Sequence, residues 1–295
     1  MTDTTSADTT VLVCGAGAMG RQIAMLAALG GYETRLYDVA PEQLDIALDD
    51  LRTIMARRVA KQRNTAEEAE AAFARLAVCD DLAEAAADAD AVIEAVVERL
   101  DVKRELFAKL GELVPEEAVL ATNSSSIVSS KLADVVPNPE RLCNLHFFNP
   151  PLVLTLVELV RGPHTSSSTI ERFSAIADRM GRTTVLLEKE IFGFVVNRVL
   201  RAIFDEAIAL HEAGIASIED IDTAVTAGLN HPIGPFALLD LTGIDVNYHI
   251  KALEAEELGD PAAGPSRTLT ELYEAGRLGR KSGQGFYDYR AEGER

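Results

Sequence analysis

The chain has 295 residues, of which 47% are hydrophobic, and it carries a formal net charge of −19. At roughly 150 residues per domain, this length predicts two domains, each with enough apolar residues for its own core. The acidic charge excludes nucleic acid and anionic membranes as general partners, because both would repel the protein.

The amino terminus and the cysteines favour a cytoplasmic location. Residues 1–8 contain neither a basic start nor an apolar stretch, so we expect a short disordered tail and no secretory signal. Cys14, Cys79 and Cys143 are odd in number and widely spaced, which is typical of a reducing compartment rather than a disulfide scaffold. No apolar run approaches the ~18 residues needed to cross a bilayer, so we expect no membrane partner.

Short β-branched runs alternate with helical runs from Thr9 onward, which predicts a parallel sheet with crossover helices. In chain order we expect a strand over 9–15, a helix over 21–31, a strand over 33–38, a long amphipathic helix over 41–63, and strands over 91–96, 118–123, 141–150 and 155–162. The last two strands form a pair joined by the turn Asn149-Pro150-Pro151.

The pattern changes after Glu190. Val196, Val199, Leu200 and Ile203 recur at helical spacing with no strand alternation. We expect helices over 194–214, 218–228, 236–258 and 266–276. The predicted domains are therefore residues 1–189, an α/β domain, and residues 190–295, a smaller all-α domain.

A glycine-rich run, Gly15-Ala16-Gly17-Ala18-Met19-Gly20, lies between the first predicted strand and the first predicted helix. In a G-x-G-x-x-G fingerprint, the first glycine permits a tight turn, the second lets the backbone approach a pyrophosphate, and the third allows close helix packing. Asp38 ends the next strand, where a carboxylate can accept hydrogen bonds from a ribose 2′-hydroxyl and repels a 2′-phosphate. The pattern predicts a Rossmann-type dinucleotide-binding domain that prefers NAD to NADP. A glycine turn that binds nothing is the alternative.

Motifs in both predicted domains carry a more specific signal. They are ATNSSSI, NLHFFNP followed by TLVELV, GFVVNR, HPIGPF and GRKSGQGFYDY. In this order, over nearly the whole chain, they resemble the 3-hydroxyacyl-CoA dehydrogenase family. The resemblance implies reversible hydride transfer between NAD and the 3-hydroxyl of an L-3-hydroxyacyl-CoA, as in fatty acid β-oxidation, by a homodimer that associates through the helical domain. Leu154-Thr155 departs from the methionine and lysine that are more common in the family, which leaves the acyl or pantetheine contact open.

The resemblance makes His146 the general base and Glu158 the carboxylate that orients and stabilises its imidazolium. Two strands joined by a short turn can place such residues face to face, and a carboxylate favours a charged imidazole. A hydrogen-bonded core histidine is the alternative for His146. Ser125 and Asn197 match residues that hold the substrate oxygen, one from each domain, which implies a site in the cleft between them. Alternatively, Ser125 caps a helix and Asn197 satisfies nearby backbone.

Three further residues belong to the predicted cofactor site. Glu98 and Lys103 match family positions near the nicotinamide ribose and at the cofactor entrance, and Asn123 lies in ATNSSSI. Glu98 and Lys103 could equally be solvated charges at the start of a helix. His164, His211, His231 and His249 are scattered without the spacing of metal ligands, so we expect no metal.

A basic cluster without any acidic residue occupies 52–63. It consists of Arg52, Arg57, Arg58, Lys61 and Arg63. By the resemblance it is a landing site for the phosphates of coenzyme A, and a solvated helix face is the alternative. Two other functions stay open: a dehydrogenase of a free hydroxy acid, of the gulonate or carnitine type in the same family, and a non-catalytic dinucleotide-binding protein.

Overall fold

The computed structural model describes residues 9–290, so the tail predicted for residues 1–8 lies outside the described residues. The chain forms two compact units, one up to Phe194 and one from Val195 onward. This division lies a few residues beyond the boundary predicted after residue 189. An α/β unit followed by a smaller all-α unit is the predicted fold class, which is confirmed.

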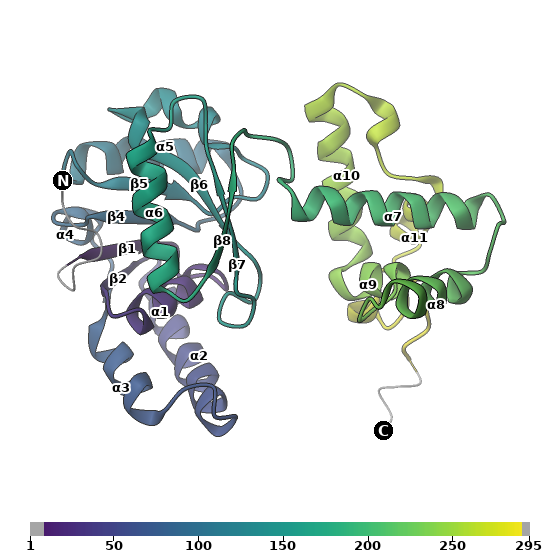
Figure 1. Ribbon diagram of the computed structural model, residues 1–295, viewed down its shortest axis with the longest axis horizontal. Helices are drawn as coiled ribbons and strands as arrows, with labels where there is room; N and C mark the ends of the chain where they lie inside the picture. The colour runs from purple at the N-terminus through teal and green to yellow at the C-terminus, as the bar shows by residue number, and fades with distance from the viewer. Residues whose placement is uncertain (1–8, 291–295) are drawn as a thin grey trace. The chain divides into compact units, whose positions relative to one another are not determined.

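The first unit is built on a sheet of eight strands within the described residues (Figure 1). The strands are β1 (Thr10–Cys14), β2 (Glu33–Tyr37), β3 (Leu76–Cys79), β4 (Ala91–Glu94), β5 (Val119–Thr122), β6 (Leu142–Phe147), β7 (Leu156–Val160) and β8 (Thr183–Leu187). The helices are α1 (Gly20–Leu29), α2 (Pro41–Ala60), α3 (Ala66–Arg75), α4 (Leu82–Ala86), α5 (Leu100–Leu113) and α6 (Ser167–Arg179), with 3-10 turns η1 (Ser129–Lys131), η2 (Ala133–Val135) and η3 (Pro139–Arg141).

The strand order is β3-β2-β1-β4-β5-β6-β7-β8. Neighbouring strands are parallel except β6 and β7, the predicted late pair, which run antiparallel. The sequence pattern does not predict the two edge strands β3 and β8. Only Leu76 of β3 and Leu187 of β8 are buried. Because so few of their residues face a core, neither strand has a clear apolar period.

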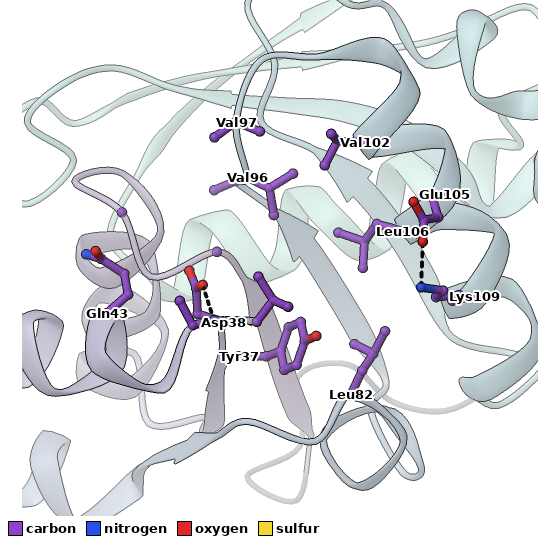
Figure 2. Close-up of a pocket in the computed structure, with 15 residues that line it drawn as sticks. Tyr37, Asp38, Gln43, Leu82, Val96, Val97, Val102, Glu105, Leu106 and Lys109 are labelled. Atoms are coloured by element: carbon purple, nitrogen blue, oxygen red, sulfur yellow. Dashed lines mark hydrogen bonds and ion pairs between the residues drawn. The ribbon is translucent and has the colours of Figure 1, made fainter.

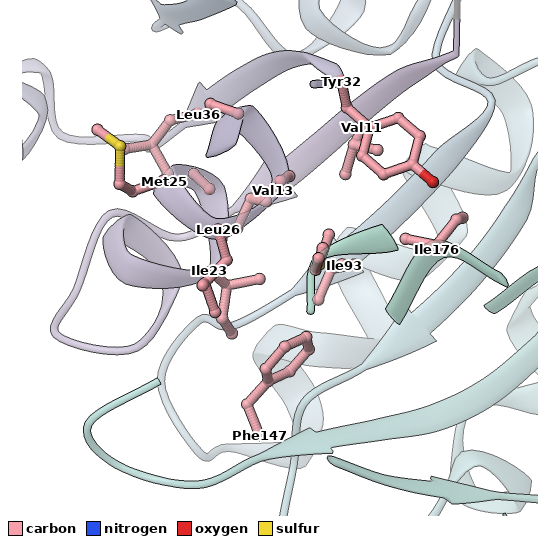
Figure 3. Packing of buried hydrophobic residues seen from close by; sticks show 14 of the residues in the cluster. Val11, Val13, Ile23, Met25, Leu26, Tyr32, Leu36, Ile93, Phe147 and Ile176 are labelled. Atoms are coloured by element: carbon pink, nitrogen blue, oxygen red, sulfur yellow. The ribbon is translucent and has the colours of Figure 1, made fainter. Parts of the chain in front are cut away.

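Both faces of the sheet are covered by helices. Val11 and Val13 of β1 pack into a layer with α1, α2, α3 and α6, part of which is shown in Figure 3. Leu12 and Cys14 of the same strand pack into the opposite layer with α4 and α5. Burial on both faces explains why β1 reads as a continuous apolar run rather than an alternating one.

The regular secondary structure of the second unit is helical, and its described residues add only isolated β-bridges after α11. It contains α7 (Val196–Glu212), α8 (Ile218–Leu229), α9 (Pro235–Thr242), α10 (Ile244–Leu258) and α11 (Arg267–Glu274), with 3-10 turns η4 (Pro261–Ala263) and η5 (Arg280–Ser282). The prediction of one continuous helix over 236–258 is wrong. Gly243 interrupts it with φ +101°, a conformation that an L side chain rarely adopts.

A buried aspartate holds the segment that follows α11. Asp240 accepts hydrogen bonds from the backbone amides of Phe286 and Tyr287, both at 2.9 Å, and from the Tyr289 hydroxyl at 3.1 Å. Burial, together with the charge of Asp240, raises the pKa of Tyr289 to about 12, so its hydroxyl stays a donor. A Cβ at Gly285 would lie 1.9 Å from an Asp240 carboxylate oxygen. The GRKSGQGFYDY motif therefore has a structural role in this unit.

No helix between residues 9 and 290 combines the length and the apolar character that crossing a bilayer requires. In the same range, no three histidine, cysteine, aspartate or glutamate side chains group together as metal ligands.

Candidate active site

The predicted site residues of the first unit lie along one edge of the sheet. β1, β2, β4, β5 and β6 are parallel, so their carboxyl ends lie at the same edge. The glycine loop follows β1, Asp38 follows β2, Glu98 lies beyond β4, residues 123–126 follow β5, and His146 is the next-to-last residue of β6. β1 and β4 are neighbours, but their connections lead to opposite ends of the sheet. This is the switch point at which open α/β sheets bind dinucleotides.

The three glycines of the loop have three different surroundings. Gly15 has φ +105°, and a Cβ on it would lie 2.6 Å from the carbonyl oxygen of Ala95. A Cβ on Gly20 would lie 1.8 Å from the carbonyl oxygen of Gly15, so this glycine lets α1 approach β1. Nothing lies within 4 Å of a Cβ built on Gly17. The protein itself does not require glycine there, which leaves the backbone open to a ligand such as a pyrophosphate. Met19 packs against the apolar core.

Asp38 joins the loop to the end of β2. Its carboxylate accepts hydrogen bonds from the amides of Ala16 at 2.7 Å and Ala40 at 3.0 Å. A pocket of about 530 Å³ opens beside it, and Figure 2 shows Tyr37, Asp38 and Leu106 among its lining residues. Mostly apolar walls, with the Asp38 carboxylate among their few polar groups, fit an adenine ring and its ribose. The residues present therefore fit the adenosine half of a dinucleotide.

His146 and Glu158 form a buried pair at the end of β6. They lie directly opposite each other across the antiparallel β6–β7 ladder, with Nδ1 of His146 2.9 Å from Oε2 of Glu158. His146 is 5% exposed and Glu158 is 0% exposed. Nε2 of His146 has no hydrogen-bond partner among residues 9–290. A core histidine with a structural role would use both nitrogens, so this geometry favours a ring that presents Nε2 to a ligand.

Two aromatic rings that the sequence pattern did not identify pack against this imidazole. The ring centroids of Phe148 and Phe194 lie 4.6 Å and 5.5 Å from that of His146. Phe194 is fully buried and has φ +50°, in the left-handed region that residues other than glycine rarely occupy. GFVVNR contained the signal, because an aromatic residue follows its glycine. The two rings limit the orientations of His146 and shield it from water.

The turn between β6 and β7 is fixed by two arginines. Arg182 donates to the carbonyl oxygens of Pro151 and Leu154, both at 3.0 Å, and Arg58 donates to that of Leu152. Arg58 therefore has a structural role at the turn and is not only part of a solvated helix face. Leu154, where the sequence departs from the family pattern, is exposed beside this turn.

The rest of the basic cluster lies on the outer side of α2 and just after it. Arg52 forms an ion pair with Asp49 at 2.8 Å. Arg57, Lys61 and Arg63 are exposed, and none of them has an ion-pair partner among the described residues. Arg57 and Lys61 are four residues apart, which places them on one side of the helix end. These three cations are available to a polyanionic ligand.

Ser124, not Ser125, makes the capping interactions in the loop after β5. The Ser124 hydroxyl accepts from the amide of Ile127 at 2.7 Å. Ser125 is exposed, and its hydroxyl has no hydrogen-bond partner among the described residues, so the capping alternative for Ser125 is wrong. Asn123 has a bridging role, because its side-chain oxygen accepts from the amide of Phe147 at 2.8 Å. This bond joins the end of β5 to the end of β6.

Lys103 is buried. Its side chain is 1% exposed, and its ammonium lies 2.6 Å from Glu94 and 3.2 Å from Glu98. The alternative of a solvated charge is therefore wrong for Lys103, and its role at the cofactor stays a prediction. Glu98 is partly exposed, and its carboxylate accepts from the hydroxyls of Ser124 and Ser126. The signal for this arrangement was Glu94, a carboxylate inside the otherwise apolar strand AVIEAV.

Asn197 belongs to the second unit. It lies in the first turn of α7, and its side chain makes no hydrogen bond to any other described residue. The alternative that it satisfies nearby backbone is therefore wrong. Its carboxamide is available to a ligand.

Comparisons with known proteins cover both units. The NAD-binding domain of 3-hydroxyacyl-CoA dehydrogenase matches residues 10–191, and the C-terminal domain of the same family matches residues 193–289. A Bacillus subtilis protein named as a probable 3-hydroxybutyryl-CoA dehydrogenase is 40% identical over 279 residues, which are 95% of this chain and 96% of its own. A 3-hydroxybutyryl-CoA dehydrogenase of Mycobacterium tuberculosis is 41% identical over 94% of this chain and 97% of its own. The crystal structure of (S)-3-hydroxybutyryl-CoA dehydrogenase from Ralstonia eutropha matches with TM-score 0.90 and 35% identity, over 96% of this chain and 99% of that one.

Proposed function

Because the chain belongs to the 3-hydroxyacyl-CoA dehydrogenase family, whose two domains are NAD-binding and C-terminal, we propose that it oxidises an L-3-hydroxyacyl-CoA to a 3-oxoacyl-CoA, reversibly and with NAD. The buried His146–Glu158 pair carries this proposal, because His146 lies at the carboxyl end of β6, at the same edge of the sheet as the glycine loop. The names of the relatives favour short substrates such as 3-hydroxybutyryl-CoA, and one of them specifies the (S) isomer.

His146 acts as the general base in this proposal. A carboxylate only accepts hydrogen bonds, so the Glu158 carboxylate fixes the proton of a neutral imidazole on Nδ1 and leaves a lone pair on Nε2. Nε2 takes the proton of the 3-hydroxyl, and Glu158 stabilises the imidazolium that forms. Bound NAD supplies the hydride acceptor. In the reverse direction the imidazolium returns the proton to the 3-oxo oxygen.

The other site residues bind and orient the ligands. The loop amides between Gly15 and Gly20, at the amino end of α1, hold the pyrophosphate. Asp38 holds the adenosine ribose and Glu98 the nicotinamide ribose. Ser125 and Asn197 hold the substrate oxygen. Neither side chain has a hydrogen-bond partner among the described residues, so both can bind a ligand.

A substrate series tests the proposed function. We expect NADH oxidation with acetoacetyl-CoA and NAD reduction with L-3-hydroxybutyryl-CoA, and none with the free acids. Initial rates over acyl-CoA thioesters of increasing length would then define chain-length preference. Activity on free hydroxy acids alone would establish the gulonate or carnitine type instead. NADH binding without turnover of any of these substrates would support a non-catalytic protein.

Cofactor choice should change when Asp38 and Val39 are altered together. The double variant Asp38→Asn, Val39→Arg removes a charge that repels a 2′-phosphate and adds one that attracts it. Its preference for NAD over NADP is expected to fall by about 100-fold. The ratio of kcat/KM for the two cofactors measures this. An unchanged ratio would mean that Asp38 does not face the adenosine ribose.

Coenzyme A recognition should depend on the exposed cations at the carboxyl end of α2. Replacing Arg57 and Lys61 together with glutamate is expected to raise KM for acetoacetyl-CoA by about tenfold, because the coenzyme phosphates lose two attractive charges and meet two repulsive ones. Acetoacetyl-pantetheine lacks those phosphates and serves as the matched control, with no change in KM expected. Equal changes for both thioesters would contradict a phosphate site at this helix.

A homodimer and a cytoplasmic location remain part of the proposal. Exposed apolar side chains in the second unit, including Val199, Leu229 and Leu258, support association through its helices. The cysteines that the structure describes are all free, in agreement with a reducing compartment. Sedimentation equilibrium would give the subunit number.

A further inference from the structure

A fully buried amide side chain interrupts the apolar pattern of β6. Asn144 is 0% exposed and lies two residues before His146, so both side chains point to the same face of the sheet. Asparagine is uncommon in strands, and burying its amide costs free energy unless new hydrogen bonds replace those to water. The reason for an amide at this position therefore lies in the groups that it binds.

The hydrogen-bond partners of Asn144 are backbone groups of the loop that follows β5. Its side-chain oxygen accepts from the amide of Ser129 at 2.7 Å. Its side-chain nitrogen donates to the carbonyl oxygens of Ser124 at 3.3 Å and Ile127 at 3.1 Å. Ser125 lies between the last two residues in the sequence, so Asn144 fixes the loop on both sides of it.

Ser129 connects this loop to the segment that ends in Phe194. Its hydroxyl donates to Oε1 of Glu190 at 2.8 Å, and the amide of Ser130 donates to the same oxygen at 2.9 Å. Val128 packs against the small apolar cluster that contains Phe194. The ring of Phe194 in turn packs against the imidazole near the end of β6. Glu190 therefore joins the segment that bears this ring to the loop after β5.

The position of Ser125 depends on the backbone on either side of it. Ser125 is exposed, and its hydroxyl has no hydrogen-bond partner among the described residues, so its own side chain does not hold it in place. A fully hydrogen-bonded buried amide specifies one arrangement of the groups around it, which an apolar side chain of similar size would not do. In an active site, a misplacement of about 1 Å can lower the rate by about 100-fold.

We propose that Asn144 and Glu190 are positioning residues for the proposed reaction and do not touch the substrate. Asn144 sets the place of Ser125 relative to His146. Glu190 sets the place of Phe194, the ring that packs against that imidazole. The inference rests on the proposed function, in which Ser125 holds the substrate oxygen and His146 takes its proton.

The principal test replaces Asn144 with alanine, both in the wild-type chain and in a Ser125→Ala chain. In the wild-type chain, kcat/KM for acetoacetyl-CoA should fall about 10- to 100-fold, at a temperature at which circular dichroism shows the variant to be folded. In the Ser125→Ala chain, the same replacement should cause at most about a threefold further loss, because it acts through a hydroxyl that is already absent. Losses that multiply in full would overturn the inference.

Glu190 provides a second test that leaves the core of the sheet unaltered. Glu190→Gln keeps an oxygen that can accept from Ser129 and Ser130, so its kcat/KM should stay close to that of the wild type. Glu190→Ala removes this oxygen, and kcat/KM should fall about fivefold or more. Equal losses in both variants would overturn a role that depends on these hydrogen bonds. If Asn144→Ala does not fold, this pair of variants decides.

Thr165→Val is the matched control for the loss of buried hydrogen bonds. The Thr165 hydroxyl donates to the carbonyl oxygen of Leu142, at the other end of β6, at 2.6 Å and accepts from the amide of Gly162 at 3.0 Å. The control should lower the melting temperature and leave kcat/KM unchanged. Unchanged kcat/KM in Asn144→Ala and Glu190→Ala, or an equal fall in the control, would overturn the inference while the proposed function stands. A wild-type chain without activity on acetoacetyl-CoA would overturn both.

Discussion

Replacing His146 with glutamine is expected to lower kcat by about a thousandfold or more, in both directions of the reaction, while the dissociation constant of NADH stays the same. Glutamine fits the buried space but cannot accept and return a proton as imidazole does. The residue lies on β6, whereas the pocket proposed for the adenosine of NAD lies beside β1 and β2, so cofactor binding should not depend on His146. Steady-state kinetics and a fluorescence titration of the same preparation measure the two quantities.

Two further variants define what this result means. Glu158→Gln keeps the shape of the pair but lets the amide donate to Nδ1, which favours the wrong tautomer, and kcat should fall by roughly 100-fold or more. His249→Gln changes a histidine of the second unit that contacts Tyr273, and it should leave kcat unchanged. Turnover by His146→Gln within tenfold of the wild type would refute His146 as the general base.

The largest effect on stability is expected from Asp240→Ala in the second unit. The change leaves the amides of Phe286 and Tyr287 and the hydroxyl of Tyr289 without their acceptor, and it opens a cavity beside Gly285. Unsatisfied buried donors cost about 1–3 kcal/mol each, so the free energy of unfolding should fall by about 3 kcal/mol or more. For a unit of this size that corresponds to a fall in melting temperature of about 10 °C or more.

Scanning calorimetry measures this change, with Asp288→Asn as the matched control. Asp288 lies in the same segment but is exposed, and its partner is the neighbouring Arg290. An exposed ion pair contributes little, so no shift in melting temperature is expected for the control. Equal melting temperatures for Asp240→Ala and the wild type would show that the segment after α11 is not held by this carboxylate.

Six of the eight strands of the first unit and its first two helices could be predicted, because their signals are local. The run from Thr9 to Gly20 contains a buried strand, a glycine turn and a helix start within a dozen residues, and each signal supports the next. The β6–β7 pair has a similar local cause, since the prolines after Asn149 end one strand and begin the turn. Edge strands such as β3 and β8 escaped prediction, because only one residue of each is buried.

The site was predictable to a different extent at each residue. Motif spacing predicted His146 opposite Glu158, and the β6–β7 register confirms that these two residues face each other. The same reasoning did not identify the structural partners of Arg58 and Lys103. Nothing near Arg58 in the sequence indicates that the carbonyl oxygen of Leu152 lies beside its guanidinium. A sequence pattern gives the sign of a residue's charge, but it does not give the residues that lie beside that charge in the folded chain.

By itself, the sequence determined the fold class, the position of the dinucleotide loop and the family of the chain, because these depend on apolar periods and motifs whose residues are close along the chain. Only the tertiary structure decided which charges are free and which are buried. Glu94, Lys103 and Thr122 lie in three separate segments, and their hydrogen bonds form when folding brings those segments together. The cost of burying an unpaired charge then requires them to pair, and that requirement exists only in the folded chain.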